Sequence, residues 1–273
     1  ADAGRRPLRD HAAMRVLIAG AAGMLGTDVV GAAGRRGHDV FGLTRHELDI
    51  TDPASIDAAI VDVGPDAIID CAAWSDVDGG ALVVLGASLL YPSTDYVFDG
   101  SKDGPYLEGD MPAPINAYGR TKLGGEVSVA AANPRHFIVR TSWLFGLGGG
   151  NFVETMLRIG AEQPEVLVVS DQRGCPTSTA DLAEGLVELI ATDAYGIHHM
   201  VGGGACSWFD FAVEIFDQAG TETRVMSATT EMMARKAARP AYSVLGHGRD
   251  DAIELPDWRR SLRRYLDDRE LVR

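Results

Sequence analysis

The chain has 273 residues, 46% of them hydrophobic, enough to bury the core of one large α/β domain or of a domain with an added lobe. Its formal net charge of -14 argues against nonspecific binding to nucleic acid or to anionic membranes, because no overall basic field attracts phosphate. Three widely spaced cysteines, Cys71, Cys175 and Cys206, favour neither a disulfide framework nor a zinc site, and they fit a cytoplasmic protein.

The N-terminal segment is interpreted as a flexible basic tail over residues 1–13, because ADAGRRPLRDHAA lacks the apolar centre of a signal peptide. No apolar run in the chain approaches the roughly 18 residues that span a membrane. We therefore expect a protein without a membrane anchor.

The first half of the chain alternates short apolar segments with amphipathic ones. Strands are predicted at residues 15–20, 39–43, 48–50, 66–73, 87–93 and 136–143. Helices are predicted over 24–38, after the start signal Thr51-Asp52-Pro53, and from near Asn116. Uniformly apolar strands separated by helices are typical of a parallel sheet covered on both faces. The prediction for residues 14–145 is a Rossmann-type, doubly wound α/β domain.

The second half begins with the glycine-rich segment GLGGGN and predicts a smaller α/β lobe over residues 146–273. Helices are predicted over 152–162, up to Leu189, over 207–220 and over 256–268, and strands over 166–170 and 196–202. We leave open that some of these later segments return to the first domain.

One crossover is too short for this pattern. Only about a dozen residues, WSDVDGGALVVLG, separate the strands at 66–73 and 87–93, whereas a parallel crossover with its helix usually needs more. Either the helix is reduced to a turn or two, or residues are missing from the sequence. We favour missing residues, because this segment shows neither a helix start nor the period of a packed helix.

A glycine-rich turn follows the first strand, with Gly20, Gly23 and Gly26 in the segment GAAGMLG. Glycines at the mouth of a helix let a pyrophosphate approach the backbone and the helix N-terminus. Because the chain has 32 glycines, the alternative is that these three only form an ordinary turn. The position between a strand and a helix favours dinucleotide binding.

The second strand ends near Thr44 and Arg45, where a strictly NAD-dependent protein would carry an acidic residue. An arginine can pair with a 2′-phosphate, so NADPH is the expected cofactor, with NADH as the alternative. Asp49 is placed to hold the adenine amino group or, alternatively, to start the next helix. For Arg45, the alternative to binding a 2′-phosphate is a solvated position on the surface.

Tyr118 and Lys122 lie four residues apart in a predicted helix, on one face, in a chain with only three lysines. A lysine there can stabilise a tyrosinate, so we expect Lys122 to lower the pKa of Tyr118 and make the pair an acid/base group. Thr94 ends a strand upstream, where its hydroxyl can polarise a carbonyl beside the tyrosine. A surface aromatic–cation pair and a turn threonine are the structural alternatives.

Eight motifs occur in order: GAAGMLG, LDITD, DCAAWSDVD, STDYVFDG, NAYGRTKLGGE, RTSWLFG, DQRGCPTSTADLA and RPAYSVL. Together they resemble the extended short-chain dehydrogenase/reductase family and, within it, the dTDP-4-dehydrorhamnose reductases. The resemblance covers nearly everything from Met14 to Leu266. It implies a Rossmann domain that binds NADPH or NADH, a C-terminal lobe that binds a nucleotide sugar, and reduction of the sugar's 4-keto group.

The resemblance also implies site residues. The family's catalytic triad corresponds to Thr94, Tyr118 and Lys122. Its cofactor contacts correspond to Gly20, Gly23, Met24, Leu25, Gly26, Asp49, Ile50, Cys71, Ala72 and Ala73, in addition to Tyr118 and Lys122. Its sugar-nucleotide pocket corresponds to Tyr96, Asn116 and Trp143, with a core position as the alternative for Trp143.

No metal is expected, because Ala180 and Asp28 stand near the places of the glutamates that bind one in some members of the family. A homodimer is a candidate assembly. Within enzymes, the alternatives are a ketoreductase for another dTDP-4-keto-6-deoxysugar and an NAD-dependent sugar epimerase or dehydratase. From another class comes a non-catalytic NADP-binding subunit, like the regulatory subunit of methionine adenosyltransferase.

Overall fold

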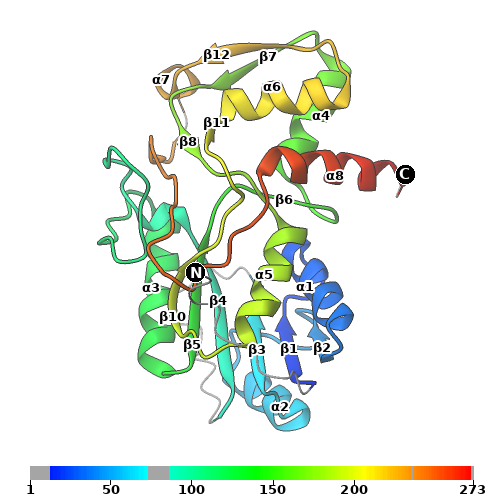
Figure 1. The fold of residues 1–273 in the computed structure, drawn as a ribbon, viewed down its shortest axis with the longest axis vertical. Coiled ribbons are helices and arrows are strands. Elements are labelled where there is room, and N and C mark those ends of the chain that lie inside the picture. The colour runs from blue at the N-terminus through cyan, green and yellow to red at the C-terminus, as the bar shows by residue number, and fades with distance from the viewer. Residues whose placement is uncertain (1–12, 73–85, 235, 272–273) are drawn as a thin grey trace, which may run out of the picture.

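A six-stranded parallel sheet in the order β10-β5-β4-β3-β1-β2 forms the centre of the protein (Figure 1). The computed structural model describes residues 13–72, 86–234 and 236–271. The strands of this sheet are β1 (Arg15–Ala19), β2 (Asp39–Leu43), β3 (Ala67–Asp70), β4 (Ser88–Thr94), β5 (His136–Thr141) and β10 (Gly196–His199). The predicted Rossmann-type fold is confirmed.

Alternate residues of the apolar strands supply two separate cores, one on each face of the sheet. Val16 and Ile18 of β1 pack with α1 (Met24–Arg35) and α5 (Thr179–Ile190). Leu17 packs on the other face with α2 (Pro53–Val63). All three β1 residues have an exposed fraction of 0%. Uniform hydrophobicity is therefore required because helices cover both faces.

The helices next to the sheet begin at the sequence signals expected for them. The Asp52 side chain accepts from Ala54 N–H at 3.0 Å, and Pro53 occupies the first turn of α2. The Asn116 side chain accepts from Gly119 N–H at 2.8 Å at the start of α3 (Ala117–Ala132). The Asn116 cap fixes where α3 begins, and hence where Tyr118 and Lys122 lie.

A second group of elements packs around its own core at the upper end of Figure 1. Its helices are α4 (Phe152–Glu162), α6 (Trp208–Ala219) and α8 (Trp258–Leu271), with the short α7 (Thr230–Met233) nearby. Its main strands, β7 (Glu165–Val169) and β12 (Arg224–Ala228), form a parallel pair. Trp258, Leu262 and Tyr265 of α8 are buried there, as the period of the last helix predicts.

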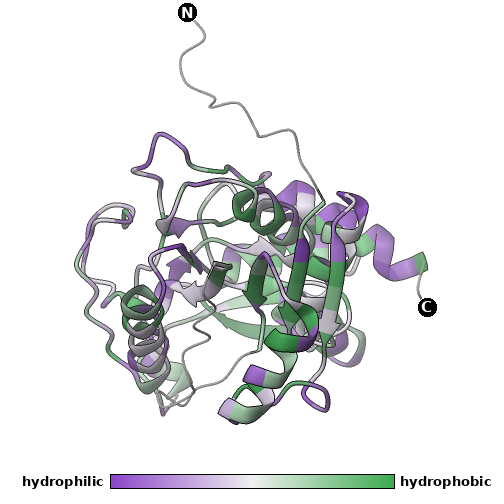
Figure 2. Cartoon of the chain, turned by 90° about the horizontal axis from the view of Figure 1, so that it is seen from below, coloured by the Kyte–Doolittle hydropathy of each residue, from purple (hydrophilic) through white to green (hydrophobic). Residues whose placement is uncertain are grey.

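Short strand pairs connect the two groups. They are β6 (Leu144–Phe145) with β9 (Thr177–Ser178), and β8 (Arg173–Gly174) with β11 (Cys206–Ser207). In Figure 2 the strands of the central sheet are mainly hydrophobic, while the outer helices carry hydrophilic segments. Within the described ranges, the model contains no helix with the length and apolar character that crossing a bilayer requires.

Several details differ from the prediction, two of them for reasons that the structure shows. Residues 48–50 are not a strand: the chain between β2 and α2 runs through turns, and its hydrophobic signal comes from Leu48, which is only 3% exposed beneath the loop. Strand β12 was not predicted, because it is short and lies only partly buried at an edge. The short crossover falls mostly in residues 73–85, outside the described part, and so does the predicted site residue Ala73.

Segments after residue 145 return to the sheet. Helix α5 packs against α1, and β10 pairs with β5. We therefore propose a domain division in which residues 14–145 together with these two elements form the Rossmann unit. The remainder of 146–273 forms the smaller lobe. The tail predicted at 1–13 lies, apart from residue 13, outside the described residues.

Candidate active site

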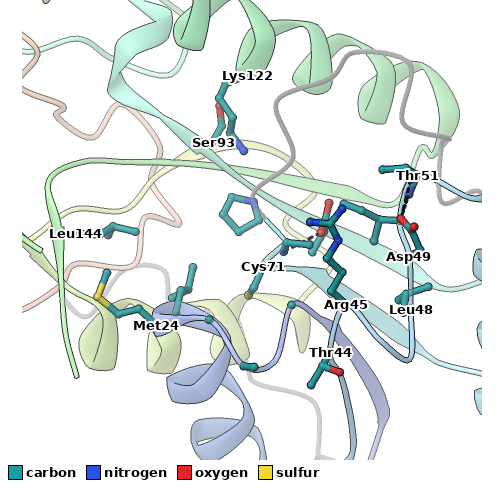
Figure 3. A pocket seen from close by; sticks show the side chains of 18 of the residues that line it. Met24, Thr44, Arg45, Leu48, Asp49, Thr51, Cys71, Ser93, Lys122 and Leu144 are labelled. Carbon is teal, nitrogen blue, oxygen red and sulfur yellow. Dashed lines mark hydrogen bonds between the residues drawn. The ribbon is translucent and has the colours of Figure 1, made fainter. Parts of the chain in front are cut away.

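A cavity of about 590 Å³ opens at the carboxyl ends of β1, β3 and β4 (Figure 3). The glycine-rich turn, the loop after β2, the end of β3 and the start of α3 line it. The predicted site residues that this cavity brings together are Gly20, Gly23, Met24, Leu25, Arg45, Asp49, Ile50, Cys71, Ala72, Tyr118 and Lys122. The carboxyl edge of a parallel sheet is where such folds bind ligands.

The glycine-rich turn is as tight as its spacing predicts. Gly20 has a φ of 71°, and a Cβ added to it would lie 2.7 Å from the backbone nitrogen of Ala72. A Cβ on Gly26 would lie 2.2 Å from the carbonyl oxygen of Gly20. Gly26 is thus buried behind the cavity wall and does not line it. Gly23 caps α1 without a side chain, which leaves the helix N-terminus open to an anion.

The loop after β2 brings a carboxylate that the sequence reasoning missed. Glu47 accepts from the Thr44 N–H and from the Thr44 hydroxyl, both at 2.9 Å. These hydrogen bonds lower the pKa of Glu47. Thr44 and Arg45 both line the cavity and are labelled in Figure 3. This region combines a cation with a nearby acidic group.

Asp49 has a structural role in addition to its position in the cavity wall. Its Oδ1 accepts from the Thr51 N–H at 3.0 Å and from the Thr51 hydroxyl at 2.7 Å, and these bonds lower its pKa. Its own N–H donates to Ser55. Asp49 therefore shapes the turn that places Ile50 and Thr51 along the cavity.

Lys122 lies at the other end of the cavity from Thr44 (Figure 3). Its Nζ is 4.1 Å from the centre of the Tyr91 ring on β4, which gives a cation–π contact. Burial lowers the pKa of Lys122 to about 8, against the opposing fields of Asp70 and Glu126. Burial also raises the pKa of Asp70 to about 6. Asp70, which ends β3 and lines the same cavity, was not predicted from the sequence as a site residue.

The predicted lowering of the Tyr118 pKa by Lys122 is wrong in this structure. Partial burial raises the pKa of Tyr118, the field of Asp95 raises it further, and hydrogen bonding with Thr94 acts in the opposite direction. The physical reason is placement, since the Lys122 ammonium lies over Tyr91 and is influenced by Asp70 and Glu126. The Tyr118 side chain is 51% exposed.

Thr94 and Tyr96 lie beside Tyr118, outside the residues that line the cavity. Thr94 is 5% exposed, and its hydroxyl donates to Asp95 Oδ1 at 3.1 Å and accepts from the Tyr96 N–H at 3.2 Å. The Tyr96 and Tyr118 rings meet edge to face with centres 6.0 Å apart. Thr94 and Tyr118 thus lie close to each other, as predicted, and Tyr96 contacts Tyr118 beside them.

Asn116 and Trp143 make structural contacts in this conformation, and their role in a sugar-nucleotide pocket stays a prediction. Asn116 caps α3 and donates from Nδ2 to the carbonyl of Ala238 at 3.0 Å. Trp143 stacks on Trp208 with ring centres 3.6 Å apart, packed against the core of the second group. Neither residue lines the cavity, and for Trp143 the alternative of a core position accounts for its contacts.

A buried ion pair supports the strand and helix that carry these groups. Arg140 of β5 donates from Nε and Nη2 to Glu126 of α3, at 3.0 and 2.7 Å. The hydroxyl of Ser93, which precedes Thr94, donates to the same carboxylate at 2.5 Å. The side chains of Arg140 and Glu126 are 1% and 4% exposed. The only sequence signal was an acid four residues after Lys122, on the same helical face.

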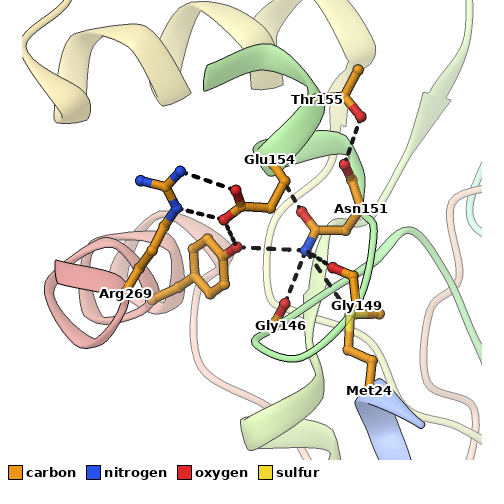
Figure 4. Close-up of polar contacts among 8 residues, drawn as sticks. Met24, Gly146, Gly149, Asn151, Glu154, Thr155 and Arg269 are labelled. Atoms are coloured by element: carbon orange, nitrogen blue, oxygen red, sulfur yellow. Dashed lines mark hydrogen bonds and ion pairs between the residues drawn. The ribbon is translucent and has the colours of Figure 1, made fainter. Parts of the chain in front are cut away.

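The glycine-rich loop 146–150 is fastened to the cavity wall by Asn151 (Figure 4). Its Nδ2 donates to the carbonyls of Gly146 and Gly149 at 2.9 and 3.3 Å, and approaches Met24 Sδ at 3.9 Å. Its Oδ1 accepts from the Glu154 N–H at 3.0 Å. Glu154 in turn pairs with Arg269 of α8. This chain of contacts connects the last helix to Met24, the first residue of α1.

Within residues 13–72, 86–234 and 236–271, no three His, Cys, Asp or Glu side chains gather in a way that could hold a metal ion. Asp28, near one place considered for a metal ligand, instead accepts from the Thr179 hydroxyl at 2.5 Å. Burial raises the pKa of Asp28.

Comparison with known proteins connects this geometry to a family. The family model described as "RmlD substrate binding domain" matches residues 14–81 and 80–271, and its break falls in the short crossover. The chain is 38% identical to the spore coat polysaccharide biosynthesis protein SpsK of Bacillus subtilis, over 93% of this chain and 98% of that protein. It is 40% identical to a dTDP-4-dehydrorhamnose reductase of Streptomyces griseus, over 91% of each chain.

A crystal structure of dTDP-4-dehydrorhamnose reductase from Bacillus anthracis, in complex with NADP, superposes with a TM-score of 0.89. It is 37% identical in sequence, over 94% of this chain and 100% of that one. The match by sequence, by fold and over nearly the whole length leads to one conclusion. The chain belongs to the RmlD substrate-binding-domain family.

Proposed function

We propose that the protein is an NADPH-dependent oxidoreductase that reduces the 4-keto group of dTDP-4-dehydro-L-rhamnose to give dTDP-L-rhamnose. The observation that carries the proposal is one cavity, in a member of this family, lined by both the glycine turn and the Tyr118–Lys122 pair. A cytoplasmic step in the synthesis of a cell-wall or surface polysaccharide is the corresponding cellular role.

NADPH fits the residues present. The open N-terminus of α1 suits the pyrophosphate, and Arg45 suits a 2′-phosphate. The related reductase from Bacillus anthracis was crystallised in complex with NADP. Bound NADPH supplies a hydride to the carbonyl carbon of the sugar. NADH is the alternative, which the Glu47 carboxylate beside Thr44 favours.

Tyr118 donates the proton that completes the reduction. When the carbonyl carbon accepts the hydride, its oxygen becomes an alkoxide, and the Tyr118 O–H bond breaks to protonate that oxygen. The Thr94 hydroxyl stabilises the tyrosinate left behind, because its hydrogen bond acts against the burial that raises the pKa of Tyr118. Lys122 holds a cationic charge at the same end of the cavity, where it would hold the ribose of the bound cofactor.

The sugar specificity has a second candidate. A dTDP-4-keto-6-deoxy-D-glucose reductase of Streptomyces niveus is 40% identical over 85% of this chain and 88% of that protein. Its identity equals that of the Streptomyces griseus dehydrorhamnose reductase. A ketoreductase for another dTDP-4-keto-6-deoxysugar is therefore the alternative within the same chemistry. For assembly, we propose a homodimer.

The test is oxidation of NADPH and of NADH by the purified protein with dTDP-4-dehydro-L-rhamnose and with other dTDP-4-keto-6-deoxysugars. We expect stoichiometric NADPH oxidation and a dTDP-L-rhamnose product identified by mass and by NMR. Redox-neutral turnover would instead identify an epimerase or dehydratase. Cofactor binding without turnover of any of these sugars would support a non-catalytic NADP-binding subunit.

A further inference from the structure

Asp95 is a buried carboxyl beside the proposed proton donor, and the reaction described above does not use it. It begins the 3-10 turn η1 (Asp95–Val97), directly after Thr94, and is 2% exposed. Its Oδ1 accepts from the Thr94 hydroxyl at 3.1 Å. Its Oδ2 is buried without a hydrogen bond of normal geometry. A carboxylate this poorly solvated needs a reason to be there.

The Thr94 hydroxyl has one proton and two oxygens that compete for it. Its own oxygen already accepts from the Tyr96 N–H at 3.2 Å. If Asp95 is ionised, its carboxylate can only accept, so it takes the Thr94 proton. If Asp95 is neutral, its O–H can donate to Thr94, and the Thr94 proton is then free to turn toward Tyr118.

We propose that Asp95 is a positioning residue that decides whether Thr94 donates its hydroxyl proton to Tyr118. The neutral carboxyl directs that proton to the Tyr118 oxygen, where it stabilises the tyrosinate formed during reduction, and the carboxylate withdraws it. The inference rests on the proposed function of Tyr118 as proton donor. The only proton transferred is that of Tyr118; around Thr94 only the direction of the hydrogen bonds changes.

Both forms of Asp95 are accessible near neutral pH. Burial raises the pKa of Asp95 to about 7, while the Ser243 and Thr94 hydroxyls act against this. The titratable groups that feel the charge of Asp95 are Tyr96 on the same turn, Tyr118 on α3 and Cys175 between β8 and β9. Burial raises the pKa of all three, so they stay neutral while Asp95 titrates.

The direct test is an ultraviolet difference titration of Tyr118, in which each protein is compared with its own Tyr118→Phe variant. In Asp95→Asn the side-chain amide donates permanently to Thr94, so Tyr118 should ionise about one pH unit lower than in the wild type, a tenfold change in tyrosinate population. Loss of the Asp95 charge alone also favours the tyrosinate. The same substitution is therefore repeated in a Thr94→Val background, where the shift should be clearly smaller.

An equal shift in both backgrounds would reduce Asp95 to a simple charge and overturn the proposal, as would no shift at all. This titration needs no substrate, so it decides the inference even if the protein fails to reduce the proposed sugar. A wild-type protein that does not reduce the sugar would contradict the proposed function alone and would leave the inference about Asp95 to the titration.

The second test is the pH dependence of kcat/KM in the active protein. Asp95 is neutral below its pKa, so activity should fall as the pH rises through about 7. In Asp95→Asn the fall should move up by about one unit, to the pKa of Lys122 at about 8. Ser243→Ala removes a nearby hydroxyl that lowers the pKa of Asp95, so it should also move the fall upward.

Asp103→Asn is the matched control, because Asp103 is an exposed acid in the loop that follows η1. The pH at which kcat/KM falls should be the same in Asp103→Asn as in the wild type. A fall that stays in place in both Asp95→Asn and Ser243→Ala would contradict the proposal, since a merely structural role for Asp95 does not move it.

Discussion

The two ends of the cavity are built in different ways. The glycine end consists of backbone: Gly20 and Gly26 allow strand, turn and helix to approach within distances that no Cβ tolerates. The Tyr118 end consists of ionisable side chains whose pKa values are shifted by burial, including Lys122 and Asp70. Under the proposed function, steric fit therefore governs cofactor binding at one end, while desolvation and charge govern reactivity at the other.

The largest effect on the reactive end is expected from Glu126→Gln. It leaves the buried Arg140 guanidinium without its carboxylate, which should lower the free energy of unfolding by about 3–5 kcal/mol. Urea unfolding measures this loss. The double variant Glu126→Leu/Arg140→Met, which removes both charges, should recover most of the stability, and a double variant as unstable as the single one would contradict this account.

The next effect concerns the glycine end. In Gly26→Ala the new Cβ would lie 2.2 Å from the Gly20 carbonyl oxygen, so the variant should lose about 3 kcal/mol of stability and its NADPH binding. Gly34→Ala is the control in the same helix, because nothing lies within 4 Å of its Cβ. It should gain about 0.5–1 kcal/mol and keep its affinity. Thermal melts with and without NADPH compare the two, and equal behaviour would refute the steric argument.

The sequence predicted the glycine end better than the reactive end for a physical reason. The turn at Gly20 is local, so a short motif between a strand and a helix specifies it. The contact of Lys122 with Tyr91 joins α3 to β4, and spacing within α3 says nothing of it. Spacing placed Tyr118 and Lys122 on one helix near one cavity, but it could not say which neighbour each side chain would face.

The same distinction explains the remaining differences. Asn116 matched a binding position in the family pattern, and that role stays a prediction; the structure adds that the residue caps α3, which Asn also does well. The Glu126–Arg140 pair and Asp95 were missed because burial, which makes them important, depends on tertiary packing. Leu48 looked like part of a strand because an apolar residue under a loop resembles a short strand in sequence.

A smaller effect is expected where the second lobe touches the glycine end. Asn151→Ala releases the 146–150 loop from its bonds near Met24, so the Kd for NADPH should rise about fivefold, close to 1 kcal/mol. Fluorescence titration of NADPH measures it. Thr229→Ala removes the cap of α7 and should leave the Kd unchanged. Equal Kd values for both variants would show that the loop has no part in binding.

The smallest effect concerns the choice of cofactor. Glu47→Gln removes the negative charge that engages Thr44, so the preference for NADPH over NADH should rise about threefold, as expected for an exposed charge. The ratio of kcat/KM values for the two cofactors measures this preference. Asp57→Asn, an exposed acid on α2, is the control. A ratio that falls in Glu47→Gln would place the 2′-phosphate elsewhere.

The separation of the two ends is tested most directly by Tyr118→Phe, with kcat and the Kd for NADPH measured on the same protein. Loss of the proton donor should reduce kcat by about 10²–10⁴-fold. The Kd should stay within about twofold of the wild type, because the glycine end is untouched. A variant that keeps most of its turnover would contradict the role of Tyr118, and one that loses NADPH binding would contradict the division of the cavity.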